Sequence, residues 1–107
     1  RRNLQKIIDL CTKKGIKTIW VRTTPANEAS NQVAAEELRR RQDHIDVYNQ
    51  IADHVMNKNK TPIIDLNIFT RNLGPEIYLN KVDLVHFNVE TAKLQAAFIA
   101  GNILSIL

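Results

Sequence analysis

Apolar residues near the start of the chain recur at helical spacing, with charged residues between them. This pattern predicts an amphipathic helix over residues 3–14, with an apolar side formed by Leu4, Ile7, Ile8, Leu10 and Cys11. Gly15 follows, at a position where helices commonly end. Residues 17–23 are rich in β-branched and aromatic side chains, which predicts a strand. A helix joined to a strand by a short glycine turn is half of a βαβ unit, so a parallel sheet is expected.

The rest of the chain predicts two more helices and one more strand. Residues 33–57 form a helical pattern, with room for a break near 41–43, and a stripe expected to be buried: Ile45, Tyr48, Ile51, Ala52, Val55 and Met56. Residues 62–66 predict a short strand that begins with proline. Residues 67–88 show no strong periodicity and are expected to be loop. Residues 89–106 predict a final helix with Asn88 as its N-cap and an apolar face of Ala92, Ala96, Ile99, Ile103 and Ile106.

Three helices and two parallel strands do not complete a stable sheet, because parallel sheets need neighbouring strands and cover on both faces. The expected fold is therefore the C-terminal half of a three-layer α/β/α sandwich with a parallel sheet. The chain opens with Arg1 and no leader-like segment. We therefore expect residues 1–107 to be the C-terminal portion of a single larger domain, and the sequence does not indicate a localisation.

Composition narrows the class of protein. Apolar residues make up 44% of the chain and charged residues 24%, which argues against disorder. No apolar run approaches the ~20 residues of a membrane-spanning helix, so no membrane span is expected. A net charge of +4 is too small to indicate a nucleic-acid partner. The single cysteine, Cys11, excludes a disulfide scaffold and a cysteine-based zinc site within these residues.

The strongest candidate for chemistry is the pair Asp83 and His86, directly before the final predicted helix. A carboxylate three residues before a histidine in a turn can reach the imidazole Nδ1. Such a contact fixes the tautomer of the histidine and stabilises the imidazolium during general-base catalysis. On spacing alone, a turn aspartate beside a partly exposed histidine is the more common arrangement.

Thr-Thr-Pro follows the first strand, Tyr48-Asn49 lies on the long helix, and Asp-x-x-His-Phe-Asn precedes the last helix. These motifs and the order of the elements resemble the C-terminal half of the SGNH hydrolases, or GDSL esterases. The resemblance implies a flavodoxin-like fold and ester hydrolysis through an acyl-serine intermediate. It implies Asp83 as the triad acid and His86 as the general base. The implied substrate is a small-acyl ester, such as an O-acetylated carbohydrate, or a lipid ester, with no metal or organic cofactor.

The serine and oxyanion motifs of that family, Gly-Asp-Ser and Gly-x-Asn-Asp, do not occur here. The only serines, Ser30 and Ser105, lie at positions that match neither. The resemblance thus implies that the nucleophile belongs to a missing N-terminal half of the same domain, and that this chain alone is not a complete enzyme.

Several other residues have two interpretations. Asp65, at the end of the second strand, is an alternative acid, although a structural role is favoured. Arg39–Arg41 suggests an alternative function, a non-catalytic α/β binding module whose basic face meets a polyanion, although a solvated helix face is favoured. His44 and His54 are expected on the surface, without metal-ligand spacing. Trp20, Tyr48 and Cys11 are expected to be core residues.

Overall fold

The computed structural model describes residues 1–27, 35–74, 76–79 and 86–107. In these residues the elements follow in the order α1 (Arg2–Lys13), β1 (Trp20–Val21), α2 (Ala35–Lys58), β2 (Ile63–Ile64), α3 (Leu66–Arg71) and α4 (Val89–Ile106). The strands pair in parallel, with Trp20 opposite Ile63 and Val21 opposite Ile64. The predicted parallel pairing is confirmed, although each strand is only two residues long.

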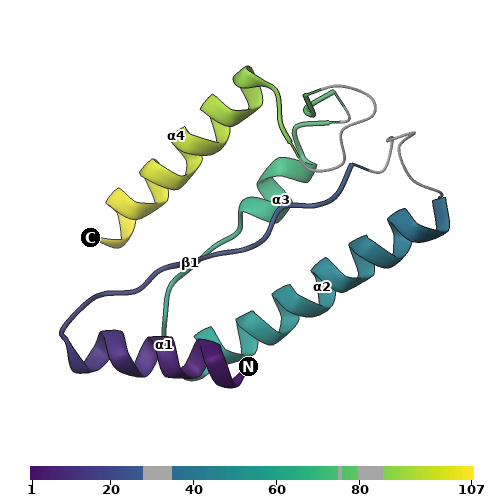
Figure 1. Cartoon of the computed structure of the whole chain (residues 1–107). Helices are drawn as coiled ribbons and strands as arrows, with labels where there is room; N and C mark the ends of the chain where they lie inside the picture. Colours follow the sequence, from purple (N-terminus) through teal and green to yellow (C-terminus); the bar gives the residue numbers. More distant parts are fainter. Residues whose placement is uncertain (28–34, 75, 80–85) are drawn as a thin grey trace.

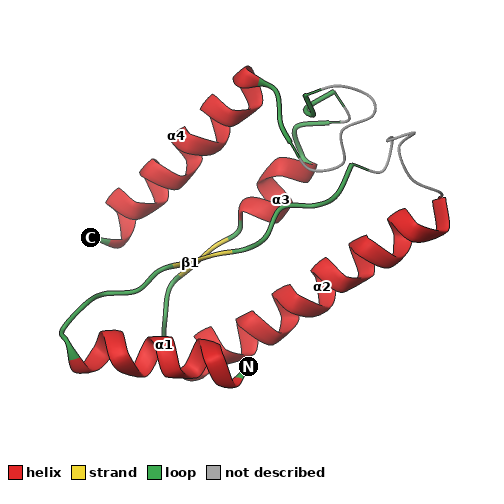
Figure 2. Ribbon diagram, viewed as in Figure 1, coloured by secondary structure: helices red, strands yellow, loops and turns green. Residues whose placement is uncertain are grey.

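The strand pair crosses the middle of the molecule. Figure 1 shows α1 and α2 on one side of the pair and α4 on the other. Helix α1 packs against α2, and α3 packs against α4. The strands are short beside the helices that surround them (Figure 2).

The expected three-layer α/β/α sandwich of flavodoxin-like type is wrong for this chain, because the described residues are mostly helical and form a single two-stranded sheet. Local side chains limit both strands. After β1, the backbone N–H and carbonyl of Thr23 are bound by the side chain of Asn49. After β2, Asp65 caps α3 by accepting a hydrogen bond from the Ile68 N–H at 3.0 Å. The chain therefore leaves the extended conformation within a few residues.

The core lies between α1, α2 and the strands. Ile8 of α1 packs with Val55 and Met56 of α2, and these three side chains are 6%, 2% and 3% exposed. Leu4, Trp20 and Ile63 pack against them while remaining partly exposed. Burial of these aliphatic side chains fixes α1 across the C-terminal half of α2.

Two helices end with the same hydrogen-bond arrangement, the Schellman motif. In α1 the Ile16 N–H binds the Cys11 carbonyl at 2.9 Å, and Gly15 has a φ of 71°. In α2 the Thr61 N–H binds the Met56 carbonyl at 2.9 Å, and Lys60 has a φ of 56°. This left-handed position favours glycine, so Lys60 bears a conformational cost that Gly15 does not.

The predicted helix boundaries are confirmed for α1 and α4 to within one residue. The Asn88 side chain caps α4 by accepting a hydrogen bond from the Thr91 N–H at 2.9 Å, as predicted. Helix α2 continues through residues 41–43 without a break, and its predicted start at Val33 lies outside the described residues. The prediction of loop for residues 67–88 is wrong at its start, where α3 forms.

Two burial predictions are wrong. Tyr48 is 65% exposed rather than part of the core. In α4 the buried residues are Thr91 and Gln95, whereas Ala92 and Ala96 of the predicted apolar face are exposed. At the start of α4 the buried face is therefore rotated by one residue from the predicted one, whereas Ile99, Ile103 and Ile106 of the predicted face are partly buried.

Candidate active site

The loop that follows β1 is held in place by side chains from two helices, α2 and α3. Asn49 of α2 accepts a hydrogen bond from the Thr23 N–H at 3.0 Å and donates one to the Thr23 carbonyl at 3.1 Å. Asn67 of α3 donates to the same carbonyl at 2.8 Å. Further along the loop, the Ala26 N–H donates to the side-chain oxygen of Gln42 at 2.9 Å. Because these contacts are polar and partly buried, the backbone leaving the carboxyl end of β1 is rigidly defined.

The main chain from His86 to Asn88 is hydrogen-bonded to residues 77–79. The His86 carbonyl accepts a hydrogen bond from the Leu79 N–H at 2.8 Å, and the Asn88 N–H donates to the Ile77 carbonyl at 2.9 Å. Between these bonds, Phe87 forms an antiparallel bridge with Tyr78. The His86 residue itself is exposed. The chain therefore fixes the main chain of His86 and presents the residue to solvent directly before α4.

Tyr78 joins the two segments that carry these features. Its ring stacks on Phe87, next to His86, with centroids 5.0 Å apart and an interplanar angle of 24°. Its hydroxyl donates a hydrogen bond to the Pro25 carbonyl at 2.9 Å. The residue beside His86 is thus coupled through one aromatic side chain to the loop after β1. Open parallel sheets bind ligands at this carboxyl end of their strands.

Asp83 and Ser30 lie outside the described residues, so the predicted contact between Asp83 and His86 has no described geometry. Ser105 is exposed near the end of α4. Of the two residues of the predicted pair, the described structure therefore places His86.

Arg22 is a charged residue that the sequence analysis did not single out. Its guanidinium binds both oxygens of Asp53, at 2.9 and 2.8 Å, and also pairs with Asp65. The hydrogen bonds that Arg22 donates to Asp53 raise the pKa of Arg22; partial burial opposes the rise, and the charges of the two carboxylates add to it. A signal was present in the sequence, because an arginine directly after an apolar strand needs a counter-charge when it is partly buried.

Asp65 therefore has a structural position. One of its oxygens caps α3 and the other pairs with Arg22. A hollow of about 320 Å³ opens beside this cluster, with Asn49, Gln50 and Asn67 among its lining residues. Since Asp65 is already committed to Arg22 and to the backbone of α3, the alternative in which it orients a catalytic histidine gains no support from this geometry.

The other candidates lie at the surface. Arg39, Arg40 and Arg41 are all exposed on α2, and consecutive helical residues point about 100° apart, so they do not share one face. His44 and His54 are exposed as well. Cys11 is half-buried on α1. Within the described residues no group of three or more histidine, cysteine, aspartate or glutamate side chains is arranged to hold a metal ion.

Comparison with known proteins assigns no family. No family model matches the chain, and no curated protein matches it. None of the helices in the described part of the chain has the length and apolar character that crossing a bilayer requires.

Proposed function

We propose that this protein is a serine ester hydrolase in which His86 is the general base and Asp83 is the acid that orients it. The observation that carries the proposal is the placement of His86: an exposed residue on a hydrogen-bonded backbone, joined through Tyr78 to the loop at the carboxyl end of β1. General-base catalysis needs a histidine that substrate can reach and whose position does not drift.

In this mechanism His86 removes the proton from a serine hydroxyl as the serine attacks the ester carbonyl. The protonated imidazole then returns that proton to the departing alcohol, which leaves an acyl-serine. Water hydrolyses the acyl-serine in a second step, again with His86 as base. Asp83 accepts a hydrogen bond from Nδ1 and stabilises the imidazolium in both steps. The serine belongs to a part of the domain outside residues 1–107, since Ser30 and Ser105 match no nucleophile motif.

The substrates that fit the proposal are esters of small acyl groups, including acetyl groups on carbohydrates, and lipid esters. The chemistry requires no metal or organic cofactor, because the acid, the base and the nucleophile are all side chains.

The test is hydrolysis of p-nitrophenyl acetate by the complete protein and its histidine variants. His86→Ala is expected to remove most of the activity while leaving the melting temperature unchanged, because the exposed residue contributes little to packing. His44→Ala and His54→Ala are matched controls, since both residues are also exposed. Activity of His86→Ala near that of the parent protein would overturn the assignment.

The alternative function, polyanion binding through Arg39–Arg41, gives a different result in a second measurement. Binding to heparin that weakens steeply with added salt and is lost in Arg39→Gln/Arg40→Gln, together with no ester hydrolysis by the complete protein, would favour that alternative.

A further inference from the structure

The net positive charge of the chain is concentrated at its start. Residues 1–17 contain six of the fifteen basic residues and one of the eleven acidic residues, so their net charge is +5. Because the net charge of the whole chain is +4, residues 18–107 have a net charge of −1. These six are Arg1, Arg2, Lys6, Lys13, Lys14 and Lys17. All six are exposed. This part of the surface therefore attracts anionic partners although the chain as a whole is only weakly basic.

The same segment exposes large aliphatic side chains. Ile7 is 57% exposed and Leu10 is 54% exposed, although both belong to the apolar side that the sequence predicts for this helix. Residues three apart share a helix face, and Lys14, four residues after Leu10, lies on that face too. Lys6 and Lys13 flank it. We call Lys6, Ile7, Leu10, Lys13 and Lys14 the outer face of α1.

The inner face of α1 is held to the rest of the molecule. Ile8 is buried against Val55 and Met56. The carboxamides of Gln5 and Asn59 bind each other reciprocally, at 3.0 and 2.8 Å, and so join α1 to the end of α2. Because the inner face is anchored in this way, the outer face is presented in a defined orientation.

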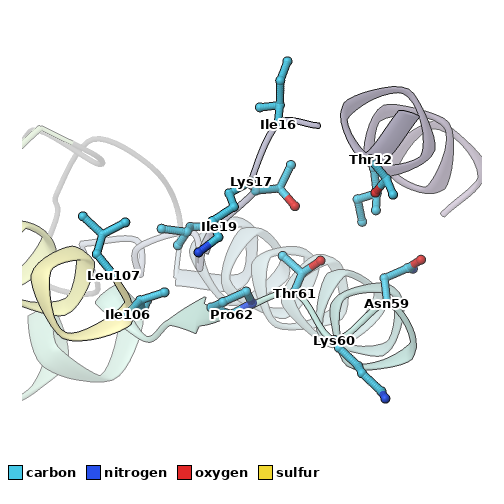
Figure 3. Close-up of a pocket in the computed structure, with 12 residues that line it drawn as sticks. Thr12, Ile16, Lys17, Ile19, Asn59, Lys60, Thr61, Pro62, Ile106 and Leu107 are labelled. Atoms are coloured by element: carbon cyan, nitrogen blue, oxygen red, sulfur yellow. The ribbon is translucent and has the colours of Figure 1, made fainter. Parts of the chain in front are cut away.

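The mixture of cations and aliphatic side chains continues past the end of α1. A hollow of about 420 Å³ begins there, and its aliphatic lining includes Ile16, Ile19 and Leu107. Figure 3 shows the end of α4 on one side of the hollow and Thr12 and Asn59 on the other. Lys17 and Lys60 also line it, and the side chain of Lys60 extends outward from the rim.

We propose that the outer face of α1, together with the exposed Ile16 and Lys17 that follow this helix, docks on the surface of an anionic lipid bilayer. Helices that lie in a membrane interface combine lysines, which meet lipid phosphates, with aliphatic side chains that enter the acyl boundary. A purely electrostatic partner such as a nucleic acid uses the lysines but gains nothing from the exposed Ile7 and Leu10. A second copy would bring two strongly basic faces together, which is unfavourable. The proposal is independent of the esterase function.

The experiment measures partitioning of the complete protein into vesicles of phosphatidylcholine with phosphatidylserine and into vesicles of phosphatidylcholine alone. Binding to the anionic vesicles is expected to be about tenfold stronger or more, because each lysine near an anionic surface contributes on the order of 1 kcal/mol, and 1.4 kcal/mol is about tenfold. Lys13→Gln/Lys14→Gln is expected to lower that binding about tenfold. Arg39→Gln/Arg40→Gln removes the same charge from α2 and is expected to change it less than about twofold.

A second pair of variants tests the aliphatic contribution. Leu10→Ser is expected to lower partitioning several-fold, whereas Leu94→Ser, on α4 and 49% exposed, is expected to leave it unchanged. Four results would overturn the proposal. The first is no binding to anionic vesicles, and the second is equal losses of binding in the two charge variants. The third is unchanged lipid binding by Leu10→Ser with full displacement by heparin, and the fourth is self-association without lipid that Leu10→Ser abolishes. The third would identify a soluble polyanion as the partner, and the fourth a second copy.

Discussion

Gln95 donates a hydrogen bond from its side-chain nitrogen to the hydroxyl oxygen of Thr70 at 3.0 Å, and both residues are buried. This polar contact lies between α3 and α4, where the sequence predicts an alanine-rich apolar face. Since Thr70 is fully inaccessible, its hydroxyl and the Gln95 amide satisfy each other in place of water.

Thr70→Val is expected to lower the free energy of unfolding by about 1–3 kcal/mol, because it leaves the buried Gln95 amide without this acceptor. Urea denaturation of the complete protein measures the loss. The double variant Thr70→Val/Gln95→Leu removes both polar groups and is expected to recover most of the stability. A double variant less stable than Thr70→Val would show that packing, rather than the unpaired amide, determines the effect.

The two Schellman motifs provide a matched pair of opposite substitutions. Lys60→Gly is expected to stabilise the protein by about 0.5–1 kcal/mol, because glycine adopts positive φ without the Cβ conflict of lysine. Gly15→Ala is expected to destabilise it by roughly 1 kcal/mol for the same reason. No atom lies within 4 Å of a Cβ added at Gly15, so crowding does not contribute. Thermal unfolding measures both, and shifts of the same sign would contradict the backbone explanation.

The cap of α4 is also testable, because Asn88 makes two separable contacts. Its side-chain oxygen accepts from the Thr91 N–H, and its amide nitrogen donates to the Glu76 carbonyl at 3.1 Å. Asn88→Ala removes both and is expected to cost about 1 kcal/mol of stability. Asn88→Asp keeps the acceptor and places a negative charge at the start of a helix, so it is expected to retain most of the stability. Equal losses in the two variants would assign the effect to the Glu76 contact.

Asp65 and Asp83 are expected to respond in opposite ways to replacement by asparagine. Asp65→Asn weakens the pairing with Arg22, so about 1–3 kcal/mol of stability is lost with little change in turnover. Asp83→Asn is expected to lower turnover by ~10²-fold or more at nearly constant melting temperature, as befits a residue that controls the histidine tautomer. Both kcat and Tm of the complete protein are measured. If Asp65→Asn abolishes turnover and Asp83→Asn changes only Tm, the assignment of the acid is reversed.

The sequence predicted the features that depend on local chemistry. The glycine stop at Gly15, the cap at Asn88 and the parallel connection between β1 and β2 are confirmed, because each follows from backbone geometry or short-range periodicity. Strand length was overestimated, because apolar β-branched residues indicate a tendency to extend but do not show whether a partner strand is present.

Contacts between distant segments were the part that the sequence could not supply. Helix α3 was missed because its six residues are too few to display a period, and Asp65 was considered as an acid rather than as its cap. The bond between Tyr78 and Pro25 joins residues 53 positions apart, and neither residue type predicts it. The link through Tyr78 between Phe87, next to His86, and the loop after β1 therefore required the three-dimensional structure.

The carboxamide of Asn49 also affects how this protein behaves in a concentrated solution. By accepting from the N–H of Thr23 and donating to its carbonyl, the side chain occupies backbone groups through which the chain directly after β1 could pair with another extended chain. Unpaired strand edges are templates for aggregation, and natural proteins block them with local devices of this kind. Asn49, a residue of helix α2, therefore blocks the pairing of a further strand with the chain at Thr23.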